Sequence, residues 1–397
     1  MKTVWIIGAG MGPDTVTQEG LRAIQGADVL LGAKRMLAGF SYLGKPSIEQ
    51  YIPQQVATSV RTSQSQRFAV LVSGDVGFFS AAQGLVQALD FCRVELVSGI
   101  SSLHYFFARL QLPWQDAAAV SCHGRSCNLA DTVRRNRLTF ALTGGNIPEL
   151  VAKLLQADFG DLQVFVGENL GMGNERIFSC PVHQLKEHTV GSLAVLLIQN
   201  PAASAQVPTG IPDGQFIRGA VPMTKAEVRA VILSKLNLKP ETVCVDVGAG
   251  TGSVTVEMAL AAWKGRVFAV ERNPEALPLI QQNCKKFHIG NVESICGSAP
   301  EALEALPAVD AAFIGGSGGT LREIISALFA KNPAVRIVVS AITLESIDAA
   351  IEGFQSLGIS PEVIQIGVSR AKKAGGLHLL MAQNPIFIFS GGGSNEG

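Results

Sequence analysis

Two glycine-rich loops, one in each half of the chain, are the parts of this sequence best suited to bind a ligand. Each follows an apolar run typical of a buried parallel strand, and each precedes a segment that can form a helix. Glycine lets the backbone approach a ligand closely, and the N–H groups at a helix start favour a negative group such as a carboxylate. Two such loops predict two ligand sites and two chemical steps. Their residues are Gly8, Gly10 and Gly12 in the first loop, and Gly248, Ala249, Gly250, Thr251 and Gly252 in the second.

An acid accompanies the second loop. Glu271 closes the next apolar run, Arg266 to Val270, 23 residues after Gly248, where a carboxylate can accept hydrogen bonds from ribose hydroxyls. A dinucleotide loop would prefer glycine or alanine where Ser253 stands, and a triphosphate loop needs a Gly-Lys-Ser/Thr run that is absent. The pattern therefore favours S-adenosylmethionine (SAM). A tight turn followed by an ordinary surface glutamate is the structural alternative.

The first loop is weaker evidence when taken alone. Pro13 removes a backbone donor where a phosphate would need one, and no acid closes the next apolar run, Ala27 to Leu31. The resemblance of this loop to a dinucleotide loop is therefore superficial, and other residues are needed to complete a site.

Apolar runs alternate with potential helices in both halves. This alternation predicts an α/β protein with mostly parallel sheets covered by helices, and ligands then bind beyond the carboxyl ends of the strands, where both loops fall. The connection 369–384 has no clear helix, which predicts an antiparallel hairpin at one sheet edge. The expected strands are 3–8, 27–31, 68–73, 94–98, 138–142, 163–167 and 193–199 in the first half, and 243–247, 266–271, 292–296, 308–314, 336–341, 362–368 and 385–389 in the second.

The amino-acid composition changes between residues 200 and 214, and this stretch divides the chain. This stretch contains three prolines and many small residues, and it has no periodic apolar pattern, as is typical of a linker. We therefore expect a first domain at 1–200, a linker at 201–210 and a second domain at 211–397.

Composition and charge exclude several classes of partner. The 397 residues carry 32 basic and 32 acidic side chains, so no overall field favours nucleic acid or an anionic membrane. No apolar run approaches the roughly 20 residues that span a bilayer, and we expect a cytoplasmic protein. The seven cysteines include no C-x-x-C pair, which predicts buried, reduced thiols and no structural metal site.

Five motifs in the second half resemble, in order, those of the decarboxylating precorrin C15-methyltransferase family. They are 211–216, 221–229, 246–254, 297–300 and 313–319. The resemblance implies a Rossmann-like class I methyltransferase sheet. It also implies that Thr224 and the loop 248–252 contact the methionine end of SAM, that Glu271 binds its ribose, and that Ser298 and Ala299 lie on the adenine side.

Three segments of the first half look like those of the tetrapyrrole methylase family. They are the loop 8–14, the segment 71–80 and the segment 97–102, and residues 121–125 and 142–146 are closer to the C5-methylating precorrin branch. The resemblance implies a fold of two α/β lobes that binds SAM. Its site residues would be Gly74, Asp75, Val76, Ser101 and Ser102 for the cofactor, with His123 and Arg125 for the substrate.

Two positions in this first-half match have a structural alternative. Val76 stands where the family usually has proline, which puts the shape of the 74–75 turn in question. Asp75 is equally suited to cap the helix that follows it.

Together the resemblances imply SAM-dependent methylation of a precorrin at C5 and C15, with decarboxylation of a ring acetate in corrin biosynthesis, by a homo-oligomer. No catalytic side chain can be nominated, because an electron-rich ring carbon attacks a methyl sulfonium without a strong protein nucleophile and positioning supplies most of the catalysis. Carboxylates of the substrate need cationic partners. The candidates are Arg218, Lys225, Arg370, Lys372 and Lys373.

Two other functions stay open on the sequence. One is a nicotinamide-dependent reductase that uses the Gly248 loop. The other is a carrier of corrinoid intermediates in which one half is a degenerate binding module, an alternative kept open by Val76.

Overall fold

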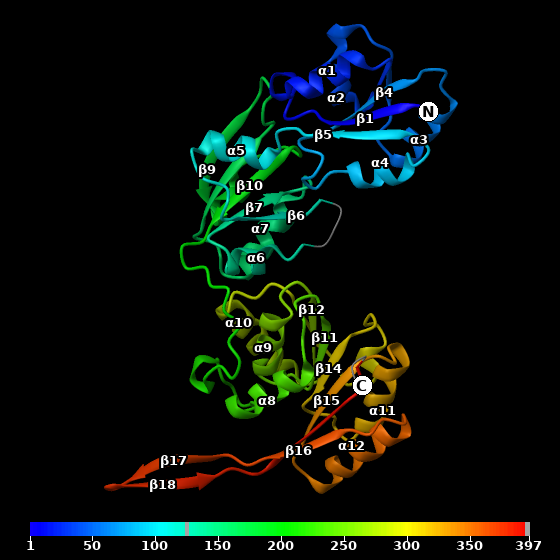
Figure 1. Cartoon of the computed structure of the whole chain (residues 1–397). Coiled ribbons are helices and arrows are strands. Elements are labelled where there is room, and N and C mark those ends of the chain that lie inside the picture. Colours follow the sequence, from blue (N-terminus) through cyan, green and yellow to red (C-terminus); the bar gives the residue numbers. More distant parts are fainter. Residues whose placement is uncertain (124–126, 394–397) are drawn as a thin grey trace. The chain divides into compact units, whose positions relative to one another are not determined.

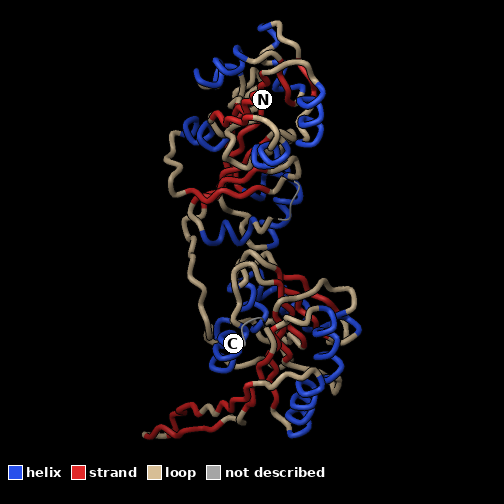
Figure 2. The backbone as a smooth tube through the Cα atoms, turned by 45° about the vertical axis from the view of Figure 1, so that its right-hand side comes forward, coloured by secondary structure: helices blue, strands red, loops and turns tan. Residues whose placement is uncertain are grey.

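The computed structural model describes residues 1–123 and 127–393. Contacts divide this chain into two compact units. The first unit contains Met1–Cys127, Asn136–Val151 and Leu162–Pro201, and the second contains Asn128–Arg135, Ala152–Asp161 and the residues from Ala202 onward. No helix or strand lies between Gln199 and Asp213. Each unit is described separately below (Figures 1 and 2).

A parallel five-stranded sheet forms the first lobe of the first unit, in the order β3-β2-β4-β1-β5. The strand β1 is buried at Val4, Ile6 and Ile7, as expected when helices cover both faces of a parallel sheet. Thr17 caps α1, and Ser101 caps α5. The elements are β1 (Thr3–Gly8), α1 (Gln18–Gly26), β2 (Val29–Gly32), α2 (Lys34–Ala38), β3 (Ser47–Glu49), α3 (Pro53–Thr62), β4 (Arg67–Val72), α4 (Ala82–Ala88), β5 (Arg93–Val97) and α5 (Ser102–Leu110).

The second lobe departs from the predicted parallel arrangement. Its sheet has the order β6-β7-β10-β8-β9, and only β6 and β7 are parallel. For β8 and β9 the reason is the short connection 169–175, which allows a hairpin but not the crossover that parallel neighbours require. Its strands are β6 (Ala117–Ser121), β7 (Leu138–Leu142), β8 (Gln163–Glu168), β9 (Arg176–Pro181) and β10 (Ala194–Gln199), and the connections between them contain α6 (Leu129–Arg135) and α7 (Ile147–Gln156).

The second unit is built on a seven-stranded sheet of order β13-β12-β11-β14-β15-β19-β16, parallel except for β19. The chain runs outward from β11 to β13 and then returns to β14, so β11 and β14 flank the switch point where such sheets bind ligands. The elements are α8 (Ala226–Leu236), β11 (Val243–Val247), α9 (Ser253–Ala261), β12 (Arg266–Glu271), α10 (Leu277–Lys286), β13 (Val292–Cys296), β14 (Ala311–Ile314), α11 (Leu321–Lys331), β15 (Arg336–Ala341), α12 (Leu344–Ser356), β16 (Glu362–Ile366) and β19 (Ile386–Gly391).

The predicted antiparallel hairpin is present at the edge of this sheet, because β16 and β19 are antiparallel neighbours. The connection between them forms a further hairpin of its own, β17 (Ser369–Ala374) and β18 (Leu377–Ala382). Every residue of both strands is exposed. Figures 1 and 2 show this ribbon extending away from the sheet of the second unit.

The expectation of seven buried, reduced thiols is wrong. Cys122 and Cys127 form a disulfide with a Cα–Cα distance of 5.1 Å, within the usual range for such bonds. Cys296 is free but exposed. A search for C-x-x-C spacing missed the pair because the course of the loop, and not the spacing in sequence, decides which thiols meet.

Within the two described ranges, no helix combines the length and the apolar character needed to cross a membrane.

Candidate functional sites

The first glycine loop and the 74–75 turn form one structure in the first unit. A Cβ atom added to Gly8 would lie 2.7 Å from both the Gly74 oxygen and the Gly99 nitrogen, so only glycine fits at the end of β1. Gly10 and Gly74 exchange two backbone hydrogen bonds, at 3.1 and 3.0 Å. Motifs separated by more than 60 residues in sequence therefore meet at the carboxyl ends of β1, β4 and β5.

Asp75 and Ser101 hold these loops through backbone N–H groups. The two carboxylate oxygens of Asp75 accept from the N–H of Gly77 at 2.8 Å and of Gly99 at 3.0 Å. The hydroxyl of Ser101 accepts from the N–H of His104 at the start of α5. In this structure Asp75 is thus a turn residue that ties two loops together. The expectation that it caps the helix after it is wrong, because the N-cap of α4 is Ala81 and no side chain caps it.

A pocket of about 800 Å³ lies beside these loops, a volume ordinary for a small-molecule site. Of the predicted residues, Gly74, Val76, Ser102 and His123 line it, whereas Gly8, Gly10, Gly12, Asp75 and Ser101 do not. Arg125 lies outside the described residues. Residues to which the sequence assigned no role include Arg35 and Leu193, which no motif marks, and Phe79, which lies within the motif 71–80.

The second glycine loop, 248–252, joins β11 to α9. Gly250 has a φ of +55°, and an added Cβ would lie 2.8 Å from the Pro222 oxygen. The N–H of Gly250 donates to the Glu271 carboxylate at 2.9 Å, and the other oxygen of Glu271 accepts from Asn273 N–H at 2.9 Å. The predicted acid therefore stands directly at the loop, where its carboxylate holds the backbone.

Asp246, two residues before this loop, is a site residue to which the sequence assigned no role. Its side chain is fully buried; one oxygen accepts from the Thr255 hydroxyl at 2.5 Å, and the other has no hydrogen-bond partner among the described residues. Burial raises the pKa of Asp246 to about 7. An unpaired buried carboxylate oxygen beneath the loop suits a ligand that carries positive charge, such as a sulfonium or an ammonium.

The remaining predicted contacts of the second unit are also at this end of the sheet. Ser298 and Ala299 follow β13, and the Ala299 carbonyl accepts from the Thr320 hydroxyl at 2.9 Å. A pocket of about 570 Å³ lies beyond β14 and β15 and is lined by Gly316, Ile342 and Thr343 among others. Ile342 is 66% exposed, so this pocket presents an apolar surface to a ligand.

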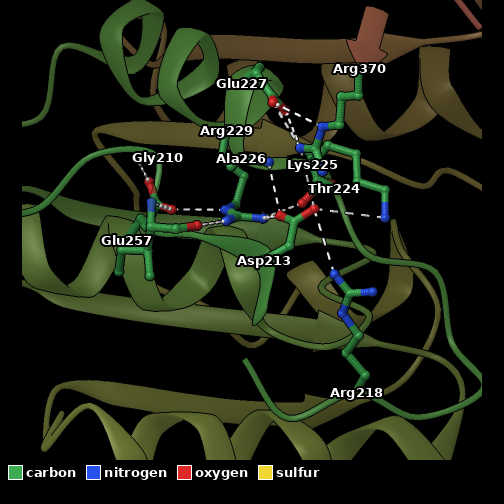
Figure 3. Close-up of polar contacts among 11 residues, drawn as sticks. Gly210, Asp213, Arg218, Thr224, Lys225, Ala226, Glu227, Arg229, Glu257 and Arg370 are labelled. Atoms are coloured by element: carbon green, nitrogen blue, oxygen red, sulfur yellow. Dashed lines mark hydrogen bonds and ion pairs between the residues drawn. The ribbon is translucent and has the colours of Figure 1, made fainter. Parts of the chain in front are cut away.

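A buried ion network lies behind the second loop (Figure 3). Arg229 on α8 has no exposed surface, and its guanidinium donates to Glu257 on α9 at 2.8 Å and to Asp213 at 3.1 Å. It also donates to the carbonyl oxygens of Thr224 and Ile211. Thr224 thus contributes its carbonyl to this network in the structure.

Three further cations surround the same aspartate. Arg218, Lys225 and Arg370 place a nitrogen 3.6, 3.9 and 3.6 Å from Asp213 Oδ2, which is buried and accepts no hydrogen bond among the described residues (Figure 3). Arg370 also pairs with Glu227 at 2.6 Å. The fold therefore gathers three of the five predicted substrate cations from distant segments. Lys372 and Lys373 lie farther along the exposed strand β17.

Comparison with known proteins relates both halves of the chain to known families. The family of tetrapyrrole (corrin/porphyrin) methylases matches residues 3–186, and the precorrin methyltransferase domain family matches residues 214–391. A probable cobalt-precorrin-6B C(15)-methyltransferase (decarboxylating) from Pyrobaculum calidifontis is 47% identical over 184 residues, covering 46% of this chain and 94% of that protein. A protein of the same description from Sulfolobus acidocaldarius is 44% identical over 186 residues, covering 46% of this chain and 96% of that protein.

One solved structure extends the comparison. It is described as precorrin-6y C5,15-methyltransferase from Geobacter metallireducens, with 41% identity, coverage of 48% of this chain and 100% of that one, and a TM-score of 0.45.

The two family matches and the fold define a methyltransferase with two parts, a tetrapyrrole methylase half followed by a Rossmann-like methyltransferase half. The chain belongs to the precorrin methyltransferase family. Methyltransferases of this family use S-adenosylmethionine.

Removing Arg229 is expected to destabilise the second unit strongly. Arg229→Met leaves Glu257 buried without its cation and removes the buried donor of Asp213, which costs about 3–5 kcal/mol. The exposed pair of Glu241 and Lys264 provides a matched control, since Glu241→Gln should cost at most ~1 kcal/mol. Urea unfolding followed by Trp263 fluorescence, with Trp5 and Trp114 replaced by Phe, measures both. A loss below about 1 kcal/mol for Arg229→Met would contradict the network's role.

Asp246 should make the stability of the second unit depend on pH. The pKa of Asp246 is about 7 in the folded protein and about 4 in the unfolded chain. Between these two values the native state keeps a proton that the unfolded chain has released, so the free energy of unfolding falls as the pH rises from about 4 to about 7. From pH 5 to 8 the wild type should lose about 2–3 kcal/mol relative to Asp246→Asn. The same urea experiment, repeated across this pH range, gives the free energy of unfolding of the wild type and of Asp246→Asn. If the two curves run parallel, the raised pKa of Asp246 is refuted.

Proposed function

We propose that this chain methylates a precorrin-6Y-type tetrapyrrole twice with SAM, in cobalamin biosynthesis. The first unit would methylate C5, and the second would methylate C15 and release carbon dioxide from a ring acetate. The observation that carries the proposal is the presence of two separate glycine-loop sites in one chain, each within a domain matched by a methylase family. The descriptions of the relatives, which name C15 methylation with decarboxylation and C5,15 methylation, support the choice of substrate.

The residues of the second loop fit SAM. Two carboxylates, Asp246 and Glu271, stand at the loop, and no basic side chain belongs to it. Such a site favours a cationic amino-acid group over a pyrophosphate, which supports SAM over a nicotinamide dinucleotide. Thr224 and the loop 248–252 would hold the methionine end, Glu271 the ribose, and Ser298 and Ala299 the adenine side.

In the first unit, the cofactor would lie against the main chain. Gly74, Val76 and Ser102 line the pocket, while Gly8, Gly10, Asp75 and Ser101 fix the loops that carry them. SAM supplies an electrophilic methyl group when bound. The protein then has to orient a ring carbon toward that methyl and exclude water, and it needs no nucleophilic side chain.

Decarboxylation in the second unit requires a carboxylate held with little water beside a conjugated ring that accepts the electron pair. The pocket beyond β14 and β15 has apolar surface at Ile342 for such a ring. The cations around Asp213 would bind peripheral carboxylates of the substrate. Arg370 would exchange its partner Glu227 for a carboxylate of the substrate, and Glu227 is about half exposed and can be solvated when released.

Two glycine variants test the assignment of one SAM site to each unit. Gly250→Arg should abolish C15 methylation and decarboxylation but leave C5 methylation, and Gly8→Val should do the reverse, because each added side chain meets backbone at under 3 Å. Mass spectrometry and NMR of the products from precorrin-6Y, or from its cobalt form, give the regiochemistry. Calorimetry with SAM should count two sites in the wild type and one in each variant.

The proposal fails if the wild-type chain forms no doubly methylated, decarboxylated product from either form of the substrate. Binding of substrate by a chain that transfers no methyl from one unit would instead favour a carrier with a degenerate half. Binding of NADPH with no binding of SAM would overturn the cofactor assignment.

The cations around Asp213 give a separate prediction. Arg370→Gln should raise KM for the C15 reaction about tenfold, as expected for the loss of a charge-assisted pair with a carboxylate, with little change in kcat. Lys286→Gln, which removes an exposed charge on α10, is the control. Equal KM values in the two variants would argue against substrate binding by Arg370.

A further inference from the structure

The pocket of the first unit contains one permanent cation, and its charge is not neutralised. Arg35 lies on α2, a helix that follows the strand β2, and no sequence motif marks it. Among the described residues, its hydrogen bond is from Nη2 to the Ser73 hydroxyl at 3.4 Å, and no carboxylate pairs with it. Ser73 directly precedes Gly74, so this guanidinium stands beside the turn that carries the cofactor loop.

The described lining of the pocket contains no acidic side chain that could neutralise Arg35. The arginine that lines the pocket of the second unit, Arg322, is by contrast paired with Glu352. An arginine that faces a pocket without an acid is arranged to meet an anion from outside the protein.

The rest of the pocket wall indicates what kind of anion fits. Phe79 is 54% exposed and Leu193 is 46% exposed, and both line the pocket with Met172. Large apolar side chains left open to solvent at a pocket favour a ligand with an extended apolar ring. The ligand class is therefore an apolar macrocycle whose edge carries a carboxylate.

His123 is a second basic group of this pocket and comes from the other lobe of the unit. It follows β6, whereas Arg35 follows β2, so the two lobes each contribute one basic side chain to the same space. A ligand with carboxylates on different edges would be oriented by both. Arg35, which stays charged at every physiological pH, would give the stronger anchor.

We propose that Arg35 binds a peripheral carboxylate of the tetrapyrrole in the first unit and thereby sets the orientation of the ring for methylation at C5. This inference rests on the proposed function. Arg35 is a positioning residue, because it would bind the edge of the ring and take no part in the transfer of the methyl group.

Kinetics of C5 methylation in the full chain provide the test. Arg35→Gln should raise KM about tenfold or more with a small effect on kcat, and Arg35→Lys should lie between, because an ammonium cannot form a bidentate pair. Lys34→Gln, on the adjacent exposed residue of α2, should match the wild type. SAM affinity and C15 methylation should be unchanged in all three variants, which verifies that they are folded. A KM for Arg35→Gln within about twofold of the wild type would overturn the proposal.

Failure of the proposed function can be told apart from failure of this inference. If the wild type does not methylate C5, the proposed function fails, and binding of uroporphyrin, an octacarboxylate tetrapyrrole, then decides the role of Arg35. Fluorescence titration should show one fewer uroporphyrin site, or one weakened site, in Arg35→Gln than in the wild type and in Lys34→Gln. Identical titrations of all three proteins would overturn the role of Arg35.

Discussion

The buried guanidinium of Arg229 is the interaction on which the site of the second unit depends. A charge without exposed surface is tolerated only when other groups satisfy all of its donors. Here two carboxylates and two backbone carbonyls do so, and they come from the segment before α8 and from α9, whereas the arginine itself lies on α8. Since α9 begins directly after the loop 248–252, the network fixes that loop from behind.

The same network explains how a chain without net charge can present positive charge to a substrate. Asp213 is bound on one side by the buried arginine and is approached on the other by three half-exposed cations. The three cations repel one another, so their close approach would be unfavourable without the negative charge of Asp213 between them. The first unit also presents positive charge to a ligand, but through the single unpaired Arg35 in a pocket whose described lining contains no acid.

Different contacts hold the glycine loops of the two units in place. In the first unit, glycines allow the ends of three strands to touch backbone to backbone, and Asp75 ties the loops through N–H groups. In the second, the loop crosses the end of β11, and a carboxylate from the neighbouring strand binds its backbone. A motif search that treats both as glycine loops misses this difference.

The sequence by itself determined the α/β class, most of the strand-and-loop pattern and the position of Glu271, because these follow from short-range periodicity and from residue types at fixed spacing. It did not determine the antiparallel second lobe, the disulfide between Cys122 and Cys127, or the pocket positions of Arg35 and Phe79. Nor could it separate Arg370, which reaches Asp213, from Lys372 and Lys373, which do not. Tertiary structure decided these points, since each depends on which distant segments meet, and the burial that leaves Asp246 unpaired exists only once the sheet is covered.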